Sequence, residues 1–303
     1  MAITAQDVKN LREMTGCGMM GCKKALAASE GDMDKAIEWL REKGLAASAK
    51  KAGRIAAEGM AYACVVDGIG VAVEVNAETD FVGKNEKFVD FVKGVANTVA
   101  KCNPADLDAL MECKYDGTDL TVLQQQQEMV LVIGENIKVR RFARFEGGFS
   151  VPYIHAGGKI GVLVNLEVTG GIDATEIGKD MAMQIAALNP RFWDKSQVTQ
   201  DVLDEEKKIM LAQMANDPKM ASKPDQVKEK IVLGKLNKFY SENCLLQQAF
   251  VKDGDMTVEQ YMNSAAKTLG GTVKFLDAVR FEKGEGIEKK QENFAEEIAK
   301  LAK

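Results

Sequence analysis

The first 45 residues carry apolar side chains at helical spacing, which predicts three short helices packed as a small bundle. Thr4 is expected to cap the first helix, with Asp7 completing a capping box, and Asp32 is expected to cap the third. Gly44 is suited to the position that ends the third helix. The apolar faces of the three helices are, in order: Val8, Leu11 and Met14; Met19, Cys22 and Leu26; Ala36, Ile37 and Leu40.

Residues 46–58 are rich in alanine and basic side chains. They contain too few large apolar residues to form a core. This composition predicts a linker that is partly helical.

From residue 59 the apolar pattern changes to a period of two, with many β-branched residues. Residues 62–66 and 71–75 are predicted strands, and Asp67-Gly68 between them is typical of a hairpin turn. A helix is expected next, because large apolar residues recur on one helical face. That face consists of Phe88, Phe91, Val92, Val95 and Val99.

A second unit of the same kind is predicted further along the chain. Residues 161–166 match residues 70–75 in pattern, and each segment is followed by a loop and a helix. Between them, a helix over 120–132 that ends near Gly134 and a strand over 137–145 are expected. The second unit's helix has an apolar face of Ile177, Met181, Ile185 and Leu188.

Residues 199–241 predict two amphipathic helices that form an antiparallel hairpin, with Pro224 at the first position of the second helix. The hairpin interrupts the second half, since strand-like sequence resumes at 273–276. The chain ends in a charged stretch with Phe294, Ile298 and Leu301 at helical spacing. The fold class is α+β, with the following parts: a three-helix module over 1–45, a linker over 46–58, a first core half over 59–146, a second over 147–198 and 242–283, the hairpin over 199–241, and a C-terminal module over 284–303.

Composition limits the function classes. The net charge of −5 and pI of about 5.3 argue against direct binding to nucleic acid or to an anionic membrane, since both need a basic face. No apolar run approaches the roughly 20 residues of a membrane span, and charged residues interrupt any signal sequence. The six cysteines are scattered, which favours reduced thiols in a cytoplasm.

The motifs of catalysis and metal binding are missing from the sequence. His155 is the single histidine, so a site with two histidines is excluded, and a structural or surface role is favoured for it. Gly157-Gly158-Lys159 leads into a strand and lacks the spacing of a phosphate-binding loop. The sequence therefore predicts neither an enzyme, nor a metal site, nor a cofactor.

Two segments have the character of a protein-binding surface. Met19 and Met20 are adjacent on a helix and cannot both face the bundle core, so at least one is expected to be exposed. Residues 79–82 place Phe81 among polar residues in a loop after a strand. From the pattern alone, Phe81 and Val82 are more readily interpreted as residues that fasten the next helix to the core, with Asp80 or Asn85 near its cap.

Several long motifs resemble the elongation factor Ts family of bacteria, in order along essentially the whole chain. The resemblance lies in residues 15–26 (TGCGMMGCKKAL), 74–82 (EVNAETDFV), 133–141 (IGENIKVRR), 153–164 (YIH through IGVLV) and 280–289 (RFE, then GEGIEK). The family often has Asp at position 21 and Pro at position 249, where this chain has Gly21 and Ala249. These departures leave the polar contact at 21 and the rigidity of the loop at 249 open.

The resemblance implies a guanine-nucleotide exchange factor that binds elongation factor Tu in its GDP state, accelerates GDP release by displacing Mg²⁺ and distorting the nucleotide site, and stays bound until GTP binds. It further implies that the three-helix module is ubiquitin-associated-like and that the hairpin is of a dimerisation type, so a homodimer is a candidate. The implied site residues are Thr79, Asp80, Phe81 and Val82 for Mg²⁺ displacement; Arg12, Met19, Met20 and Lys23 for the partner's GTPase domain; and Ile133, Gly134, Glu135, Asn136 and His155 for further contact with the partner.

Two other functions fit parts of the sequence. A ubiquitin-associated-type adaptor without exchange activity would use the same methionines. A thiol enzyme would use Cys17 or Cys22, but the sequence offers no nearby base to activate either thiol.

Overall fold

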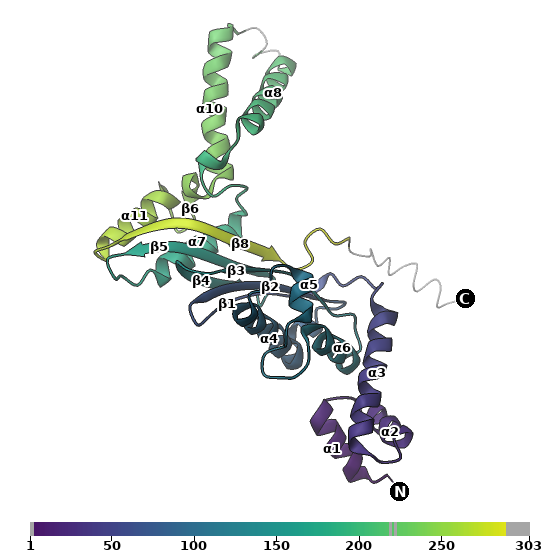
Figure 1. The fold of residues 1–303 in the computed structure, drawn as a ribbon. Helices are drawn as coiled ribbons and strands as arrows, with labels where there is room; N and C mark the ends of the chain where they lie inside the picture. Colours follow the sequence, from purple (N-terminus) through teal and green to yellow (C-terminus); the bar gives the residue numbers. More distant parts are fainter. Residues whose placement is uncertain (1–2, 218–219, 221–222, 289–303) are drawn as a thin grey trace. The chain divides into compact units, whose positions relative to one another are not determined.

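The structure is a computed structural model that describes residues 3–217, 220 and 223–288 (Figure 1). The fold is mixed α+β, with N-terminal helices, small antiparallel sheets and further helices between them, as predicted. Two compact units are present. The first contains the described residues of the ranges 1–144, 154–161 and 281–303, and the second those of the ranges 145–153 and 162–280.

The N-terminal bundle contains α1 (Ala5–Thr15), α2 (Met19–Ala28) and α3 (Met33–Lys51). Its predicted caps are confirmed: the Thr4 hydroxyl accepts from the Asp7 backbone, Asp7 accepts from the Thr4 backbone, and Asp32 accepts from the Lys35 backbone. A small apolar core holds the helices together. Its fully buried members include Leu11, Cys22, Ala25, Leu26 and Ala36.

Three predictions for the bundle are wrong. The third helix does not end at Gly44 but continues to Lys51, because Gly44 is buried where α3 packs against α6. A Cβ at Gly44 would lie 3.3 Å from the Gln127 carbonyl oxygen, so this glycine permits close helix packing instead of ending the helix. Met14 and Met19 were placed on the apolar faces of their helices, yet they are 63% and 60% exposed.

The first sheet has the strand order β1-β2-β3, formed by β1 (Glu58–Val66), β2 (Ile69–Ala77) and β3 (Lys138–Phe145). The predicted hairpin is confirmed: β1 and β2 pair antiparallel. Asp67 and Gly68 both have positive φ angles, 50° and 82°, as its tight turn requires.

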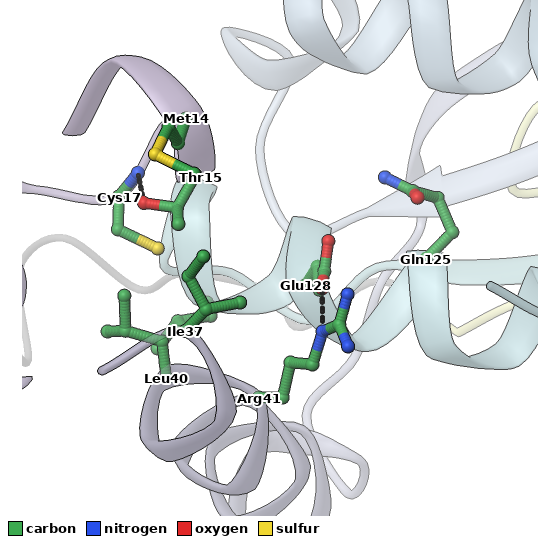
Figure 2. A pocket seen from close by; sticks show the side chains of 9 residues that line it. Met14, Thr15, Cys17, Ile37, Leu40, Arg41, Gln125 and Glu128 are labelled. Carbon is green, nitrogen blue, oxygen red and sulfur yellow. Dashed lines mark hydrogen bonds and ion pairs between the residues drawn. The ribbon is translucent and has the colours of Figure 1, made fainter. Parts of the chain in front are cut away.

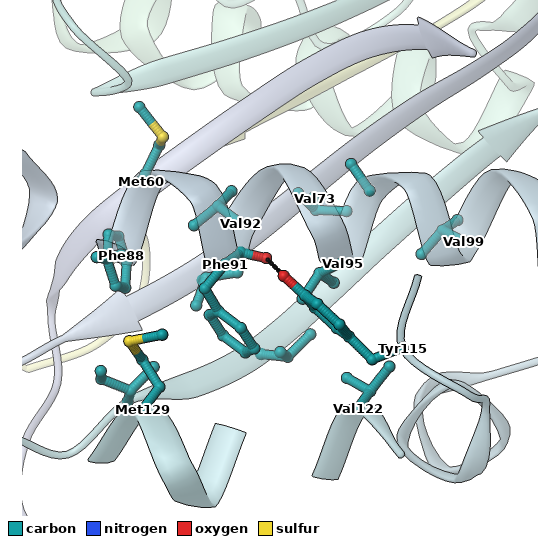
Figure 3. Packing of buried hydrophobic residues seen from close by; sticks show 14 of the residues in the cluster. Met60, Val73, Phe88, Phe91, Val92, Val95, Val99, Tyr115, Val122 and Met129 are labelled. Atoms are coloured by element: carbon teal, nitrogen blue, oxygen red, sulfur yellow. Dashed lines mark hydrogen bonds between the residues drawn. The ribbon is translucent and has the colours of Figure 1, made fainter. Parts of the chain in front are cut away.

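Helix α4 (Glu86–Cys102) packs on this sheet and buries the predicted apolar face (Figure 3). Helices α5 (Leu107–Glu112) and α6 (Val122–Ile133) complete the layer, and α6 ends at Gly134 with φ 89°, as expected. The rings of Phe91 and Tyr115 stack 5.8 Å apart, and the Tyr115 hydroxyl donates to the Phe91 carbonyl at 3.2 Å. This core provides a firm base for the loop that joins β2 to α4.

A second sheet has the order β4-β5-β8, with β4 (Phe149–His155), β5 (Ile160–Thr169) and β8 (Thr272–Glu282). In the second unit, α7 (Thr175–Leu188) packs with α11 (Val258–Thr268), and β6 (Ala249–Phe250) pairs with β7 (Asp253–Thr257). Ile177, Met181 and Ile185 are buried as predicted. Leu188 is exposed instead, because it is the last residue of its helix.

Helices α8 (Gln200–Asn216) and α10 (Asp225–Asn243) form the predicted antiparallel pair. Leu203, near the start of α8, belongs to the same apolar cluster as Phe239, near the end of α10. Met214, near the end of α8, shares a second apolar cluster with Val232 of α10. Pro224 precedes the helix as its cap residue, one position earlier than predicted.

The C-terminal helix predicted around Phe294, Ile298 and Leu301 lies outside the described residues. The predicted domain boundaries stay predictions, as does the structural similarity of the two core halves.

Candidate partner-binding surface

The loop after β2 carries an exposed aromatic side chain on a buried base. Phe81 is 82% exposed, whereas the next residue, Val82, is 5% exposed and packs into the core of the first sheet. A short 3₁₀ helix, Val82–Lys84, follows, and Asn85 caps α4 by accepting from the Lys87 backbone at 3.0 Å. The helix-fastening interpretation is therefore right for Val82 and Asn85 and wrong for Phe81.

Glycines bring this short helix close to the sheet. A Cβ at Gly83 would lie 2.8 Å from the Gly59 carbonyl oxygen, so only glycine fits there without movement. Gly59 on β1 has φ +112°, and a Cβ on it would collide with the Val75 carbonyl. The C-terminal side of Phe81 is thus seated directly on the β1–β2 ladder.

The N-terminal side of Phe81 is held by the turn after α6. Both carboxylate oxygens of Glu135 accept from Thr79: Oε2 from the backbone N–H at 2.9 Å and Oε1 from the hydroxyl at 2.7 Å. Hydrogen bonds to an ionised acceptor are stronger than neutral ones, and two on one residue also fix its orientation. Thr79 is therefore immobilised by a residue far along the chain.

A second set of bonds runs in the opposite direction. Glu78 Oε1 accepts from the Asn136 backbone N–H at 2.6 Å and lies 3.5 Å from Arg54 Nη1. The Asn136 side chain donates to the Arg54 carbonyl at 2.8 Å, and Lys51 Nζ donates to the carbonyl of Gly134. We refer to the bonds between residues 78–79 and 135–136 as the clasp.

The cations beside the clasp come from the end of α3 and the segment after it. Partial burial, together with the nearby Arg54 charge, lowers the pKa of Lys51, although Glu78 and Glu135 act in the opposite direction. These two acidic side chains thus face basic ones. The sequence showed Lys51 and Arg54 only as part of a basic linker, and their charge complementarity to the acids was the one available signal.

A separate groove between α1 and α2 is lined by all four residues that the resemblance assigned to the partner's GTPase domain: Arg12, Met19, Met20 and Lys23. Its volume is about 580 Å³. Both methionines are exposed, Met20 at 65%, where at least one was expected to be. Apolar, flexible side chains flanked by cations suit a protein surface that combines apolar and acidic groups.

The bundle also contacts the rest of the first unit (Figure 2). A cavity of about 330 Å³ lies between it and α6, lined by residues such as Met14, Leu40 and Leu131. Arg41 Nε pairs with Glu128 Oε1 at 3.2 Å beside this cavity. Lys87, in the first turn of α4, donates to the Gly16 carbonyl at 3.1 Å.

His155 and Ile133 lie elsewhere in the fold. His155 ends β4 and is exposed, outside the groove lining and outside the clasp. Ile133, the last residue of α6, packs partly against the core. Asn136 is only 7% exposed, so most of its surface contacts its own chain.

The chemistry of this surface is that of binding. Cys17 and Cys22 are buried in the bundle core, and burial raises the pKa of the Cys17 thiol, which disfavours the reactive thiolate. Within the described residues, no three His, Cys, Asp or Glu side chains gather where a metal ion could be held. Of the helices described, none has the length and apolar character needed to cross a bilayer.

Comparison with known proteins matches most of the chain to a single family. The family model described as elongation factor TS matches residues 78–285, more than half of the chain. Similar curated proteins, each named elongation factor Ts, come from Clostridium perfringens (50% identical over 305 residues, 99% of each chain), Clostridium kluyveri (48% over 304 residues, 98% of each) and Magnetococcus marinus (45% over 304 residues, 99% of each).

Proposed function

The chain belongs to the elongation factor Ts family, and we propose that it binds elongation factor Tu in its GDP state and accelerates GDP release. It is a nucleotide exchange factor and not an enzyme, since exchange makes and breaks no covalent bond. Membership in this family of bacterial translation factors agrees with the predicted cytoplasmic location.

The exposed Phe81 side chain is the observation that carries the proposal. A phenylalanine that is 82% exposed gains about 1.5–3 kcal/mol when a partner buries it. Its loop is held on both sides, by Val82 in the core and by Thr79 on Glu135, so little entropy is lost when it inserts. A rigid apolar tip of this kind is suited to displacing side chains of the partner when it inserts.

The loop would act at the partner's nucleotide site, where it displaces Mg²⁺ and distorts the pocket. Asp80 and Phe81 are exposed, so these two residues are proposed to touch the partner. Thr79 is engaged by Glu135, and Val82 is buried. Thr79 and Val82 are proposed to support them. This assignment rests on the burial of Val82 and the two bonds of Thr79.

The groove of Arg12, Met19, Met20 and Lys23 is proposed to hold the partner's GTPase domain. His155 is exposed and is proposed as a further contact, together with Ile133 and Gly134 of the α6 end. The chain would remain bound until GTP enters the empty site.

Binding and nucleotide release are linked by free energy. A factor that binds better when Mg²⁺ and phosphate contacts are broken weakens nucleotide binding by the same free energy, because coupling is reciprocal. At about 1.4 kcal/mol per tenfold, burial of Phe81 alone supplies roughly ten- to a hundredfold. Larger acceleration requires the groove contacts as well.

The finer fold assignments are also proposals. The bundle is proposed to be ubiquitin-associated-like, and the two core halves to be related units. Exposed apolar residues on the helical pair, such as Leu211 on α8 and Leu233 on α10, support a homodimer formed through it. Sedimentation that finds only monomers at high micromolar concentration would contradict the dimer.

Release of a fluorescent GDP analogue from elongation factor Tu tests the function. We expect the chain to accelerate release strongly when unlabelled GTP is in excess, and excess GDP to compete with complex formation. An adaptor without exchange activity would bind equally with and without nucleotide and leave the release rate unchanged, which would overturn the proposal.

A further inference from the structure

Residues 78 and 79 lie just beyond the end of strand β2, and side-chain hydrogen bonds to the turn after α6 hold them there. Strand β2 ends at Ala77, so its regular pairing with β1 stops there. Beyond that point, the Thr79 backbone N–H bonds to Glu135 and the Glu78 carboxylate accepts from the Asn136 backbone. These bonds join residues that are 56 and 58 positions apart in sequence, so the loop after β2 and the turn after α6 hold each other in place.

We propose that Glu135 is a positioning residue for exchange, and that the clasp sets the direction in which Phe81 projects. The proposal deepens the proposed function and rests on it. Phe81 has few contacts of its own, so its direction is determined by the backbone on either side. The core fixes the side after Phe81, and the clasp is what fixes the side before it.

The geometry favours this role over direct contact of Glu135 and Asn136 with the partner. Both carboxylate oxygens of Glu135 are already engaged by Thr79. Asn136 is 7% exposed, and both its backbone N–H and its side-chain amide donate within the chain. Residues with so few free polar atoms have little to offer a second protein, whereas they are well placed to order the loop.

The bonds of Arg54 extend the effect. Asn136 donates to the Arg54 carbonyl, and Arg54 pairs with Glu78, so the segment after α3 joins the same cluster. That segment leads to the bundle that carries the groove. The bonds of Arg54 therefore tie the clasp to the chain segment that follows the bundle.

Four variants of the full chain test the proposal by GDP release at increasing factor concentration. Glu135→Ala removes both bonds to Thr79, and Thr79→Val removes only the one from its hydroxyl. Thr79→Ser keeps the hydroxyl donor as the matched control, and Phe81→Ala removes the tip. We expect Glu135→Ala to lower the maximal release rate about tenfold, and Thr79→Val to lower it by less, each with a nearly unchanged half-saturating concentration. Thr79→Ser should behave like the wild type.

The decisive comparison combines each clasp variant with Phe81→Ala. If the clasp acts through Phe81, Glu135→Ala causes no further slowing once the phenylalanine is gone, since coupled residues are non-additive. Independent, multiplying effects would overturn the proposal. So would a raised half-saturating concentration at an unchanged maximal rate, which would assign Glu135 to direct contact.

A measurement without the partner separates this inference from the proposed function. In the free protein, the backbone amides of Thr79 and Asn136 should be protected from hydrogen exchange. The Thr79 amide should lose protection in Glu135→Ala, which removes its acceptor, and keep it in Thr79→Ser. Unprotected amides in the wild type would overturn the clasp. If Phe81→Ala alone leaves GDP release unchanged while the amides are protected, the tip's function fails and the clasp is only structural.

Discussion

At the residue scale, Glu74 shows how one side chain can order a segment far from it in sequence. It lies on β2 with no exposed surface, and its carboxylate accepts from Arg140 Nη1 at 2.9 Å, from Arg141 Nε at 2.5 Å and from the Gly284 backbone at 2.8 Å. Burial alone would raise the pKa of Glu74, but these bonds and one from Asn76 outweigh it and lower the pKa. Glu74 is therefore ionised in the fold.

Gly284 has a structural reason to be glycine at that place. Its φ is +73°, and a Cβ there would lie 2.0 Å from the Ala57 carbonyl oxygen. The Gly284 backbone N–H binds a carboxylate of its own chain, that of Glu74.

Glu74→Gln is expected to lower the free energy of unfolding by about 3 kcal/mol at pH 7, because it leaves two arginines with a neutral partner in a buried site. Urea denaturation followed by circular dichroism measures this. Glu13→Gln is the matched control, since the Glu13 pair with Lys9 is exposed and should change stability little.

The same variant has a pH signature. Because the folded-state pKa of Glu74 lies below its ordinary value of 4.5, its stabilisation is complete above that value and is lost as the pH falls through the lowered pKa. The wild type should therefore lose its advantage over Glu74→Gln below about pH 4.5. An advantage that stays constant down to pH 3 would contradict an ionised Glu74.

At the scale of elements, α1 and α2 present the groove, and its methionines are the side chains to test. Met19→Ala with Met20→Ala should weaken binding to nucleotide-free elongation factor Tu by about 2–4 kcal/mol, since each loses apolar burial. Calorimetry measures this. Met14→Ala is the control, because Met14 is equally exposed but lies outside the groove.

Equal weakening by Met14→Ala would show that the bundle surface contributes without a defined groove. The methionine substitutions test the groove more specifically than deletion of residues 1–54 would. That deletion would remove Lys51 and Arg54, which contact the turn after α6 and Glu78 and so help to order the Phe81 loop.

The sequence predicted helices and turns correctly where the residues next to each other in the chain determine the structure. The Asp67-Gly68 turn and the apolar face of α4 follow from turn chemistry and helical period, and both are confirmed. Gly44 shows the limit, because its close packing against α6 depends on a helix about 80 residues later and outweighs the usual helix-ending tendency.

Candidate site residues divide in the same way. Val82 and Asn85 were predictable as core and cap from the few residues around them. The exposure of Phe81 was not, because the bonds that hold its loop come from the 135–136 turn and leave no local signature. The resemblance named Glu135 and Asn136, but only the structure brings them to the loop.

At the scale of the whole molecule, exchange requires several contacts at once. Phe81 alone supplies roughly ten- to a hundredfold, so the remaining free energy must come from surfaces that keep the tip in place. The groove is proposed to supply affinity, the tip to supply the distortion, and the clasp to make the tip stiff. Loss of the groove should therefore change affinity most, and loss of the tip should change the rate most.

Stopped-flow release of a fluorescent GDP analogue from elongation factor Tu, at saturating factor, tests the central claim most directly. Phe81→Ala should slow release about ten- to a hundredfold, and by more than it weakens the complex, because the side chain acts on the nucleotide site. Leu45→Ala, which removes another exposed apolar side chain of the first unit, should leave the rate unchanged. A Phe81→Ala rate equal to that of the wild type would contradict the account.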